Sequence, residues 1–123
     1  MPSNKEIAVS FLNDVISGKI AEAYAAYVHP SMKHHNAYFA GDPLSLMTAM
    51  QENHKLHPLK TFSIKHVVVD GDFVVVHSHL QMSVSEPGMV VVYMFRFTAG
   101  KIVEMWDVGQ VILKDSPNEN GMF

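Results

Sequence analysis

Two histidines and an aspartate in the C-terminal half are the residues best suited to chemistry. His77 and His79 alternate with other residues in a valine-rich segment, so their imidazoles share one face if that segment is a strand. Asp107 lies beside the single tryptophan, Trp106, in the apolar stretch 101–113. Apolar surroundings shift the proton affinity of a carboxylate or imidazole, which suits it to proton transfer. We therefore predict that His79 and Asp107 are candidate acid/base groups.

A polar segment before residue 40 supplies two further candidates. His35 and Asn36 lie between the end of a predicted helix and an aromatic stretch, so they form either an exposed loop or one side of a pocket. His35 could also join the His77–His79 pair as a third metal ligand. The chain has no cysteine and no other clear third ligand, and paired strand histidines are most often ordinary, partly buried residues. We predict that no metal or organic cofactor is required.

The elements that must position these groups are helices followed by strands. A capping-box pattern at Ser3 and Glu6 predicts a first helix that ends at Gly18. A second helix is expected over 20–28 and a third from Pro43 to about residue 57, with an irregular segment over 32–38. Four strands follow, joined by turns at Asp70-Gly71, Pro87-Gly88 and Ala99-Gly100, and their predicted bounds are Thr61–Val69, Phe73–Ser85, Met89–Thr98 and Lys101–Leu113. Short connections make this an antiparallel meander, and the whole an α+β fold.

The pairing of the last two strands decides which side chains meet. If Phe97 pairs with Ile102 across the Ala99-Gly100 turn, one face of the sheet carries an aromatic group with a glutamine, namely Tyr93, Phe95, Phe97, Trp106 and Gln110. Asp107 then points to the opposite face, where it is either a structural carboxylate paired with Arg96 or a catalytic one. Which face carries His77 and His79 depends on the Pro87-Gly88 turn, because a slip of one residue exchanges the faces.

Composition narrows the classes of function. The chain has 123 residues, 48% of them hydrophobic, and a formal net charge of -3. A chain of this size forms one domain, here residues 1–123, and its charge argues against nucleic acid as a partner. The N-terminus lacks a signal-peptide pattern and no apolar run is long enough to span a membrane. We expect a cytoplasmic protein.

Several short motifs resemble those of one family. The segments are His35-Asn36 with Gly41 after it, Asp70-Gly71-Asp72, His77-Ser78-His79, Phe95-Arg96-Phe97, Gly100 to Gln110, and the terminal Asn120-Gly121-Met122-Phe123. Together they resemble the SnoaL-like branch of the nuclear transport factor two-like superfamily, and most closely its predicted aldol-condensation group. The resemblance implies three helices packed on a strongly curved, mainly antiparallel sheet of four to six strands. It further implies a cone with a pocket, dimerisation through the sheet, and catalysis without a cofactor.

The resemblance also directs attention to individual residues. In the related polyketide cyclases the acid/base aspartate lies four residues after the tryptophan, a position that corresponds to Gln110 here. Glutamine cannot exchange a proton, but it can donate a hydrogen bond to a substrate oxygen. We expect the Trp106 face to form the pocket, with His79 in it and Asp107 outside it. The candidate site comprises His35, His79 and Asp107 as catalytic groups and Tyr27, Asn36, His77, Tyr93, Phe95, Trp106 and Gln110 as substrate-binding groups.

Two functions fit these residues. The first is an enzyme that acts on a small carbonyl compound through an enolate, by aldol-type condensation, cyclisation or isomerisation in an apolar pocket. The second is a non-catalytic module that binds an apolar small molecule in the same pocket. The meander is apolar on both faces, while three helices can cover only one, so we also expect a homodimer whose interface includes Val90, Val92 and Met94.

Overall fold

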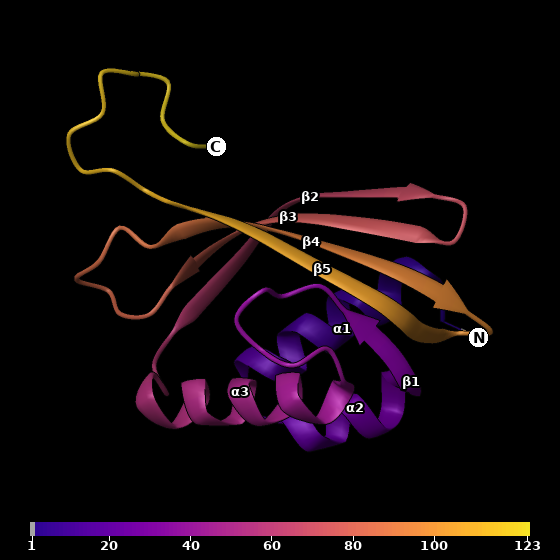
Figure 1. Ribbon diagram of the computed structural model, residues 1–123. Coiled ribbons are helices and arrows are strands. Elements are labelled where there is room, and N and C mark those ends of the chain that lie inside the picture. Colours follow the sequence, from indigo (N-terminus) through magenta and orange to yellow (C-terminus); the bar gives the residue numbers. More distant parts are fainter. Residues whose placement is uncertain (1) are drawn as a thin grey trace.

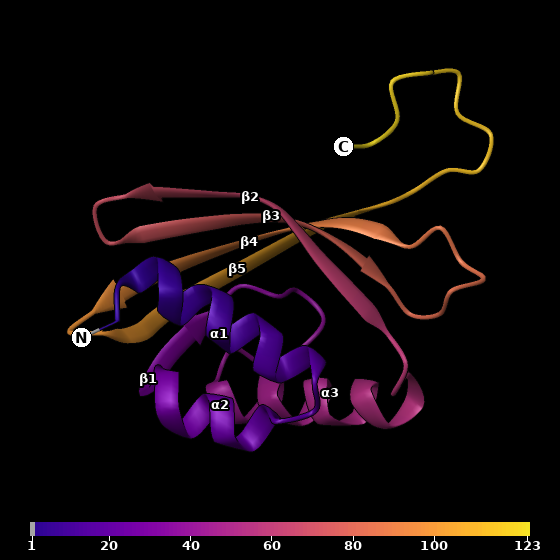
Figure 2. The same ribbon diagram turned by 180° about the vertical axis from the view of Figure 1, so that it is seen from behind.

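Three helices cover one face of a twisted five-stranded sheet (Figures 1 and 2). The computed structural model describes residues 2–123. The helices are α1 (Asn4–Ile16), α2 (Ile20–Tyr27) and α3 (Pro43–Leu56), and the strands are β1 (Val28–His34), β2 (Thr61–Asp70), β3 (Phe73–Gln81), β4 (Met89–Thr98) and β5 (Lys101–Val111). The strand order is β1-β5-β4-β3-β2, and only β1 runs parallel to its neighbour. The predicted α+β class and four-stranded antiparallel meander are confirmed.

Side-chain caps start the first and third helices where the sequence predicts. The hydroxyl of Ser3 accepts the backbone N–H of Glu6 at 3.1 Å, and the Glu6 carboxylate accepts the backbone N–H of Ser3 at 3.2 Å. This is the reciprocal capping box. At α3 the Asp42 carboxylate accepts the N–H of Ser45 at 2.9 Å, and Pro43 occupies the first turn. Each cap satisfies backbone donors that the helix itself leaves unpaired.

A glycine lets the third helix approach the turn between the first two. Gly18 has φ of +88°, a conformation that side chains with a Cβ rarely adopt. A Cβ placed there would overlap the Nε2 atom of His54 in α3. The absence of a side chain at Gly18 therefore allows the imidazole of His54 to pack against the turn.

The strand β1 is the element that sequence patterns missed. The irregular segment predicted over 32–38 begins with three residues that belong to this strand. β1 pairs with β5 through Val28 opposite Ile102 and then Lys33 opposite Glu104, with a break in register between them. Three consecutive exposed residues lie in that break, so the alternation that normally reveals a strand is absent.

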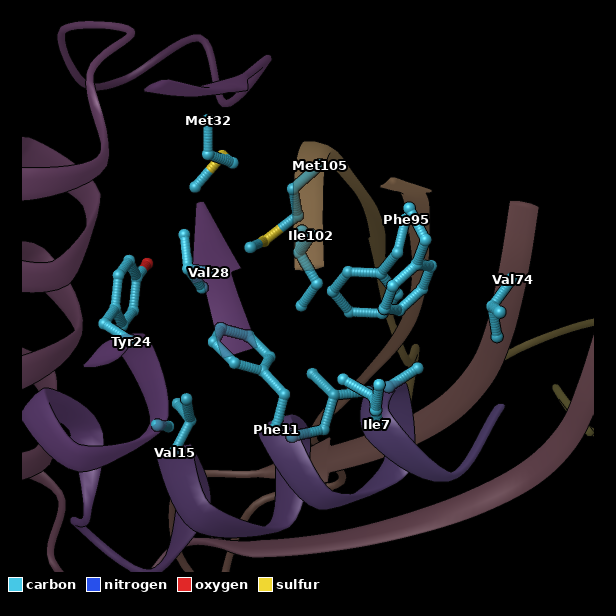
Figure 3. Packing of buried hydrophobic residues seen from close by; sticks show 14 of the residues in the cluster. Ile7, Phe11, Val15, Tyr24, Val28, Met32, Val74, Phe95, Ile102 and Met105 are labelled. Carbon is cyan, nitrogen blue, oxygen red and sulfur yellow. The ribbon is translucent and has the colours of Figure 1, made fainter. Parts of the chain in front are cut away.

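The core lies between α1, α2 and the inner face of the sheet (Figure 3). Phe11 of α1 and Phe95 of β4 are both fully buried, and their rings meet edge to face with centroids 5.9 Å apart. Burial of each such side chain contributes roughly 1.5–3 kcal/mol. This packing fixes the helices on one face, and Figures 1 and 2 show the opposite, outer face free of helices.

A β-bulge at Val103 determines which side chains of β5 face inward. Phe97 pairs with Ile102 as predicted, but the next residue of β4, Arg96, pairs with Glu104. Two residues of β5 thus oppose one residue of β4. The extra residue reverses the alternation for the rest of β5.

The bulge makes two predicted pairs wrong. Tyr93 lies opposite Asp107 rather than Trp106, and Phe95 lies opposite Met105 rather than Glu104. The inner face therefore carries Tyr93, Phe95, Met105 and Asp107, whereas the outer face carries His77, His79, Arg96, Glu104, Trp106 and Gln110. The predicted separation of Trp106 and Asp107 onto opposite faces holds, but the prediction that Asp107 points away from the Tyr93 face is wrong.

Candidate functional site

A cavity of about 640 Å³ lies between the inner face of the sheet, α3, the end of α1 and the loop after β1. Most of its lining is apolar, with Leu46 and Met50 from α3 and Leu80 and Val91 from the sheet. Its ionisable and hydrogen-bonding side chains are His35, Asn36, Tyr38, Asn53, Lys60, Tyr93 and Asp107. A few polar groups in a concave apolar site are typical of small-molecule pockets.

Asp107 and Asn36 form the polar centre of this cavity. The amide nitrogen of Asn36 lies 3.1 Å from Oδ1 and 3.2 Å from Oδ2 of Asp107, so it donates to the carboxylate. The amide oxygen of Asn36 accepts the backbone N–H of Tyr38 at 3.0 Å, which fixes the orientation of the amide. The loop after β1 thus holds the Asp107 carboxylate in one position.

Tyr93 presents a free hydroxyl beside this carboxylate. It lies directly opposite Asp107 on the neighbouring strand, and side chains in such pairs have Cβ atoms about 4.5–5.5 Å apart. Within residues 2–123 the hydroxyl has no hydrogen-bond partner, and it is not fully enclosed by protein atoms. Because Tyr93 lines the cavity, its hydroxyl opens onto that space. Burial, and then the negative charge of Asp107, raise the pKa of Tyr93 far above its usual range. Tyr93 is therefore a neutral hydrogen-bond donor.

His34 supports the loop that carries Asn36. Its side chain is buried, its Nδ1 accepts the backbone N–H of Asn36 at 3.2 Å, and its Nε2 lies 2.6 Å from the carbonyl oxygen of Ala40. An acceptor role at Nδ1 assigns the proton to Nε2. Local sequence patterns give no signal for this role of His34, because only the pairing of β1 with β5 buries its side chain.

Lys60 is a second cavity residue without a signal in the sequence. It lies between α3 and β2, and only 8% of its surface is exposed. Its ammonium group donates to the side-chain oxygen of Asn53 at 2.7 Å. Burial lowers the pKa of Lys60.

The SnoaL-like domain family matches residues 9–105 of this chain. The chain belongs to the SnoaL-like domain family. The resemblance seen in the sequence motifs to the SnoaL-like branch is confirmed. A comparison with curated proteins found no match.

Solved structures share the fold of this SnoaL-like domain. An NTF2-like protein of unknown function from Cytophaga hutchinsonii has a TM-score of 0.74 at 8% identity, over 89% of this chain and 92% of the other. A cystatin-fold protein from Novosphingobium aromaticivorans has a TM-score of 0.73 at 15% identity, over 88% and 99%. A SnoaL-like polyketide cyclase from Agrobacterium tumefaciens has a TM-score of 0.70 at 15% identity, over 89% and 93%. At these identities the likeness concerns the fold alone.

His35 lies at the rim of the cavity and turns its ring toward the outer face. The ring stacks on Trp106 with centroids 4.9 Å apart, and its Nε2 is 2.6 Å from a carboxylate oxygen of Glu104. Arg96 donates to the other Glu104 oxygen at 3.0 Å. The hydrogen bond with His35, and then that with Arg96, hold the pKa of Glu104 below its usual range. The predicted alternative of an Arg96–Asp107 pair is wrong, since Arg96 lies on the outer face.

His77 and His79 of this SnoaL-like domain also lie on the outer face. Their rings contact Phe123 of the C-terminal tail, with centroids 5.6 and 4.9 Å apart. His79 Nε2 is 2.8 Å from the carbonyl oxygen of Pro87, and His77 Nδ1 is 3.1 Å from His66 Nδ1. His79 and Trp106 share a face, as expected, but the prediction that this face forms the pocket is wrong for the cavity described here. The connection before β4 is a longer loop, 82–88, rather than the short turn predicted at Pro87-Gly88.

Three other predicted residues lie apart from the cavity lining. Phe95 is fully buried in the core, and Tyr27 packs against that core. Gln110 is exposed on the outer face, opposite Val90. The position that corresponds to the cyclase acid/base therefore lies outside this cavity, and Asp107, three residues earlier, lines it.

Metal and membrane features can be described for residues 2–123. Within this range no three histidine, aspartate or glutamate side chains are grouped so that they could hold a metal ion. The independence from metal and cofactor stays a prediction. Over the same range no helix has the length and apolar character needed to cross a membrane.

Proposed function

We propose that this SnoaL-like domain is an enzyme that removes a proton next to the carbonyl group of a small molecule. Asp107 is the base, and Tyr93 donates a hydrogen bond to the oxygen that becomes negative in the enolate. Aldol-type condensation, cyclisation and isomerisation all begin with this step. The chain supplies both groups itself, so the proposed reaction needs no cofactor.

The arrangement of Tyr93 and Asp107 carries the proposal. The Tyr93 hydroxyl, a free neutral donor, and the Asp107 carboxylate lie opposite each other in an apolar cavity. The Nδ2 atom of Asn36 donates a hydrogen bond to this carboxylate and holds it in place. In such surroundings a hydrogen bond to a developing oxyanion is stronger than in water. The Agrobacterium protein of the same fold is named a polyketide cyclase, which agrees with carbonyl chemistry in this architecture.

The alternative is a binding module without catalysis. It is favoured by the large apolar share of the lining and by the direct hydrogen bonds of Asn36 to Asp107, which engage both oxygens of the carboxylate. Both functions require a ligand in this cavity, so an assay must separate binding from proton removal.

Hydrogen exchange into a simple ketone makes this separation. Cyclohexanone is incubated with the protein in D2O, and loss of the α-proton signals is followed by nuclear magnetic resonance. The wild-type protein should accelerate exchange, and Asp107→Asn should reduce the acceleration by roughly 10²–10⁴-fold, as expected for loss of a general base. Asp115→Asn, in the exposed tail, is the matched control and should exchange like the wild type.

Two results distinguish the functions. Exchange that persists in Asp107→Asn would refute Asp107 as the base. Saturable binding of the ketone, seen as line broadening of its signals, with no accelerated exchange in any variant would favour the binding module instead.

We further propose that the protein is a homodimer formed through the outer face of the sheet. Val90, Val92 and Met94 lie on that face, and Val108 is 61% exposed there. An uncovered apolar sheet face of this kind is unusual in a monomer. Light scattering at micromolar concentration should give twice the mass of one chain, and the mass of a single chain would contradict the proposal. Val108→Lys should shift the mass toward one chain.

A further inference from the structure

Lys60 is a buried amine in the wall of the cavity that the proposed proton transfer does not use. Its side chain is 8% exposed, and the same cavity is lined by Tyr93 and Asp107. Lysine is seldom buried to this degree unless it is paired with an opposite charge. The position of Lys60 therefore calls for a specific reason.

Within residues 2–123 no carboxylate forms a salt bridge with this amine. Among residues 2–123 the salt bridges join Glu104 to His35 and to Arg96, and Lys60 takes part in none. Its hydrogen-bond acceptor is the neutral amide oxygen of Asn53, 2.7 Å away. A buried ammonium without a counter-charge is destabilised relative to the neutral amine, and burial lowers the pKa of Lys60 accordingly. The uncharged form, which has a free lone pair, is thus more accessible than in an exposed lysine.

We propose that Lys60 is a nucleophile that forms a Schiff base with the carbonyl group of a ligand bound in this cavity. This inference rests on the proposed function, because it assumes that the ligand is a carbonyl compound. It adds a covalent step to the proposed proton removal, since an iminium draws electrons from the neighbouring carbon more strongly than a ketone does. Lysines desolvated in hydrophobic pockets are the type of amine that carries out this chemistry.

The step balances without any further reactant. The Nζ lone pair attacks the carbonyl carbon, and the carbonyl π-electron pair moves to the oxygen, which takes up a proton. The resulting carbinolamine loses its oxygen as water, with both amine hydrogens, so that one C=N bond replaces one C=O bond. Protonation of the imine nitrogen gives an iminium, and removal of the α-proton by Asp107 leaves an enamine. Hydrolysis reverses the sequence and restores Lys60.

The test uses 2,4-pentanedione, a 1,3-diketone whose adduct with an amine is a conjugated and stable enaminone. Intact-protein mass spectrometry should show one adduct equal in mass to the diketone minus water, and peptide mapping should place it on Lys60. Labelling there should be at least about tenfold faster than at exposed lysines, since their amines are almost wholly protonated at neutral pH. Excess cyclohexanone should slow the labelling of Lys60 alone.

Two variants of Lys60 and one control complete the design. Lys60→Arg keeps a cation beside Asn53 but has no nucleophilic amine at neutral pH. Lys60→Met keeps only the approximate length of the side chain. Both should lose the fast adduct. Lys65→Arg removes an exposed lysine of β2 and should keep it. Circular dichroism verifies that each variant is folded. If Lys60→Arg does not fold, Lys60→Met is used for the test in its place.

The outcomes separate this inference from the proposed function. Equal labelling of all lysines, or a fast adduct that persists in folded Lys60→Arg, would overturn the role of Lys60. If both Lys60 variants retain wild-type exchange of cyclohexanone while Asp107→Asn loses it, direct enolate formation stands and the Schiff base does not. If Asp107→Asn exchanges like the wild type, the proposed function itself fails, whatever the labelling shows.

Discussion

Replacement of Tyr93 by phenylalanine separates function from stability more cleanly than any other change in the cavity. Tyr93→Phe removes only a hydroxyl group and leaves the ring, which packs near Phe62 and Phe95 with centroids 6.1 and 6.3 Å away. The apolar contacts of β4 therefore remain.

The structure sets the expected magnitudes. The hydroxyl has no hydrogen-bond partner within residues 2–123, so its loss should change the free energy of unfolding by no more than about 0.5 kcal/mol. Removal of a poorly solvated, unpaired group can even stabilise the fold. Loss of one oxyanion donor typically lowers a rate by roughly 10²–10³-fold, equivalent to about 2.7–4 kcal/mol. Activity should thus fall far more than stability.

Urea denaturation and ketone exchange measure the two quantities on the same samples. Tyr24→Phe is the matched control, because Tyr24 is also buried. As for Tyr93, burial is the main cause that raises the pKa of Tyr24, and the negative charge of Asp107 is the second. Its hydroxyl already contacts the sulfur of Met50 at 3.4 Å. Tyr24→Phe should therefore exchange close to the wild-type rate.

Either of two results would refute this reasoning. Exchange by Tyr93→Phe at the wild-type rate would show that the hydroxyl does not stabilise the developing enolate. A loss of more than about 1 kcal/mol of stability would show that the hydroxyl has a structural hydrogen bond in solution, the typical value of one such bond.

Two further changes test the fold and the outer face. Gly18→Ala should cost about 1–2 kcal/mol for the left-handed conformation and about 1–3 kcal/mol for overpacking against His54, and a double-mutant cycle with His54→Ala in urea should recover only the second part. A cycle without coupling would contradict the contact. Glu104→Gln should lower the unfolding temperature at neutral pH, because His35 and Arg96 depress the pKa of Glu104 and that stabilisation requires the carboxylate. The difference from the wild type should shrink below the ordinary glutamate pKa and vanish once the pH passes the depressed value; a difference that persists in acid would indicate another cause.

The fold was predictable from local signals because most of its elements obey them. Caps at Ser3 and Asp42 mark two helix starts, and β-branched residues with turn dipeptides mark the four strands of the meander. β1 was not predictable, because its pairing with β5 is parallel, distant in sequence and broken by unpaired residues. Its existence depends on tertiary contacts that a local pattern does not contain.

The candidate site was predictable in its residue types but not in its grouping. Asn36, Tyr93 and Asp107 were all candidates, and they line one cavity with His35 at its rim. Sequence alternation assigned Asp107 to the wrong side of the sheet, because no residue around Val103 in the sequence is typical of a bulge. Lys60 and His34 were missed for a related reason: their burial arises from elements that meet only in the folded chain.

The bulge at Val103 has a consequence for how such domains diverge. If the bulge were absent and Val103 paired with Arg96, simple alternation would bring Trp106 and Gln110 to the interior in place of Asp107. The chemistry of the interior can therefore change through the register of this strand alone, with every functional side chain retained. Two relatives aligned without a gap at their tryptophans can then present different residues to a ligand. Comparison of such proteins requires the hydrogen-bond register of the last strand as well as its amino-acid sequence.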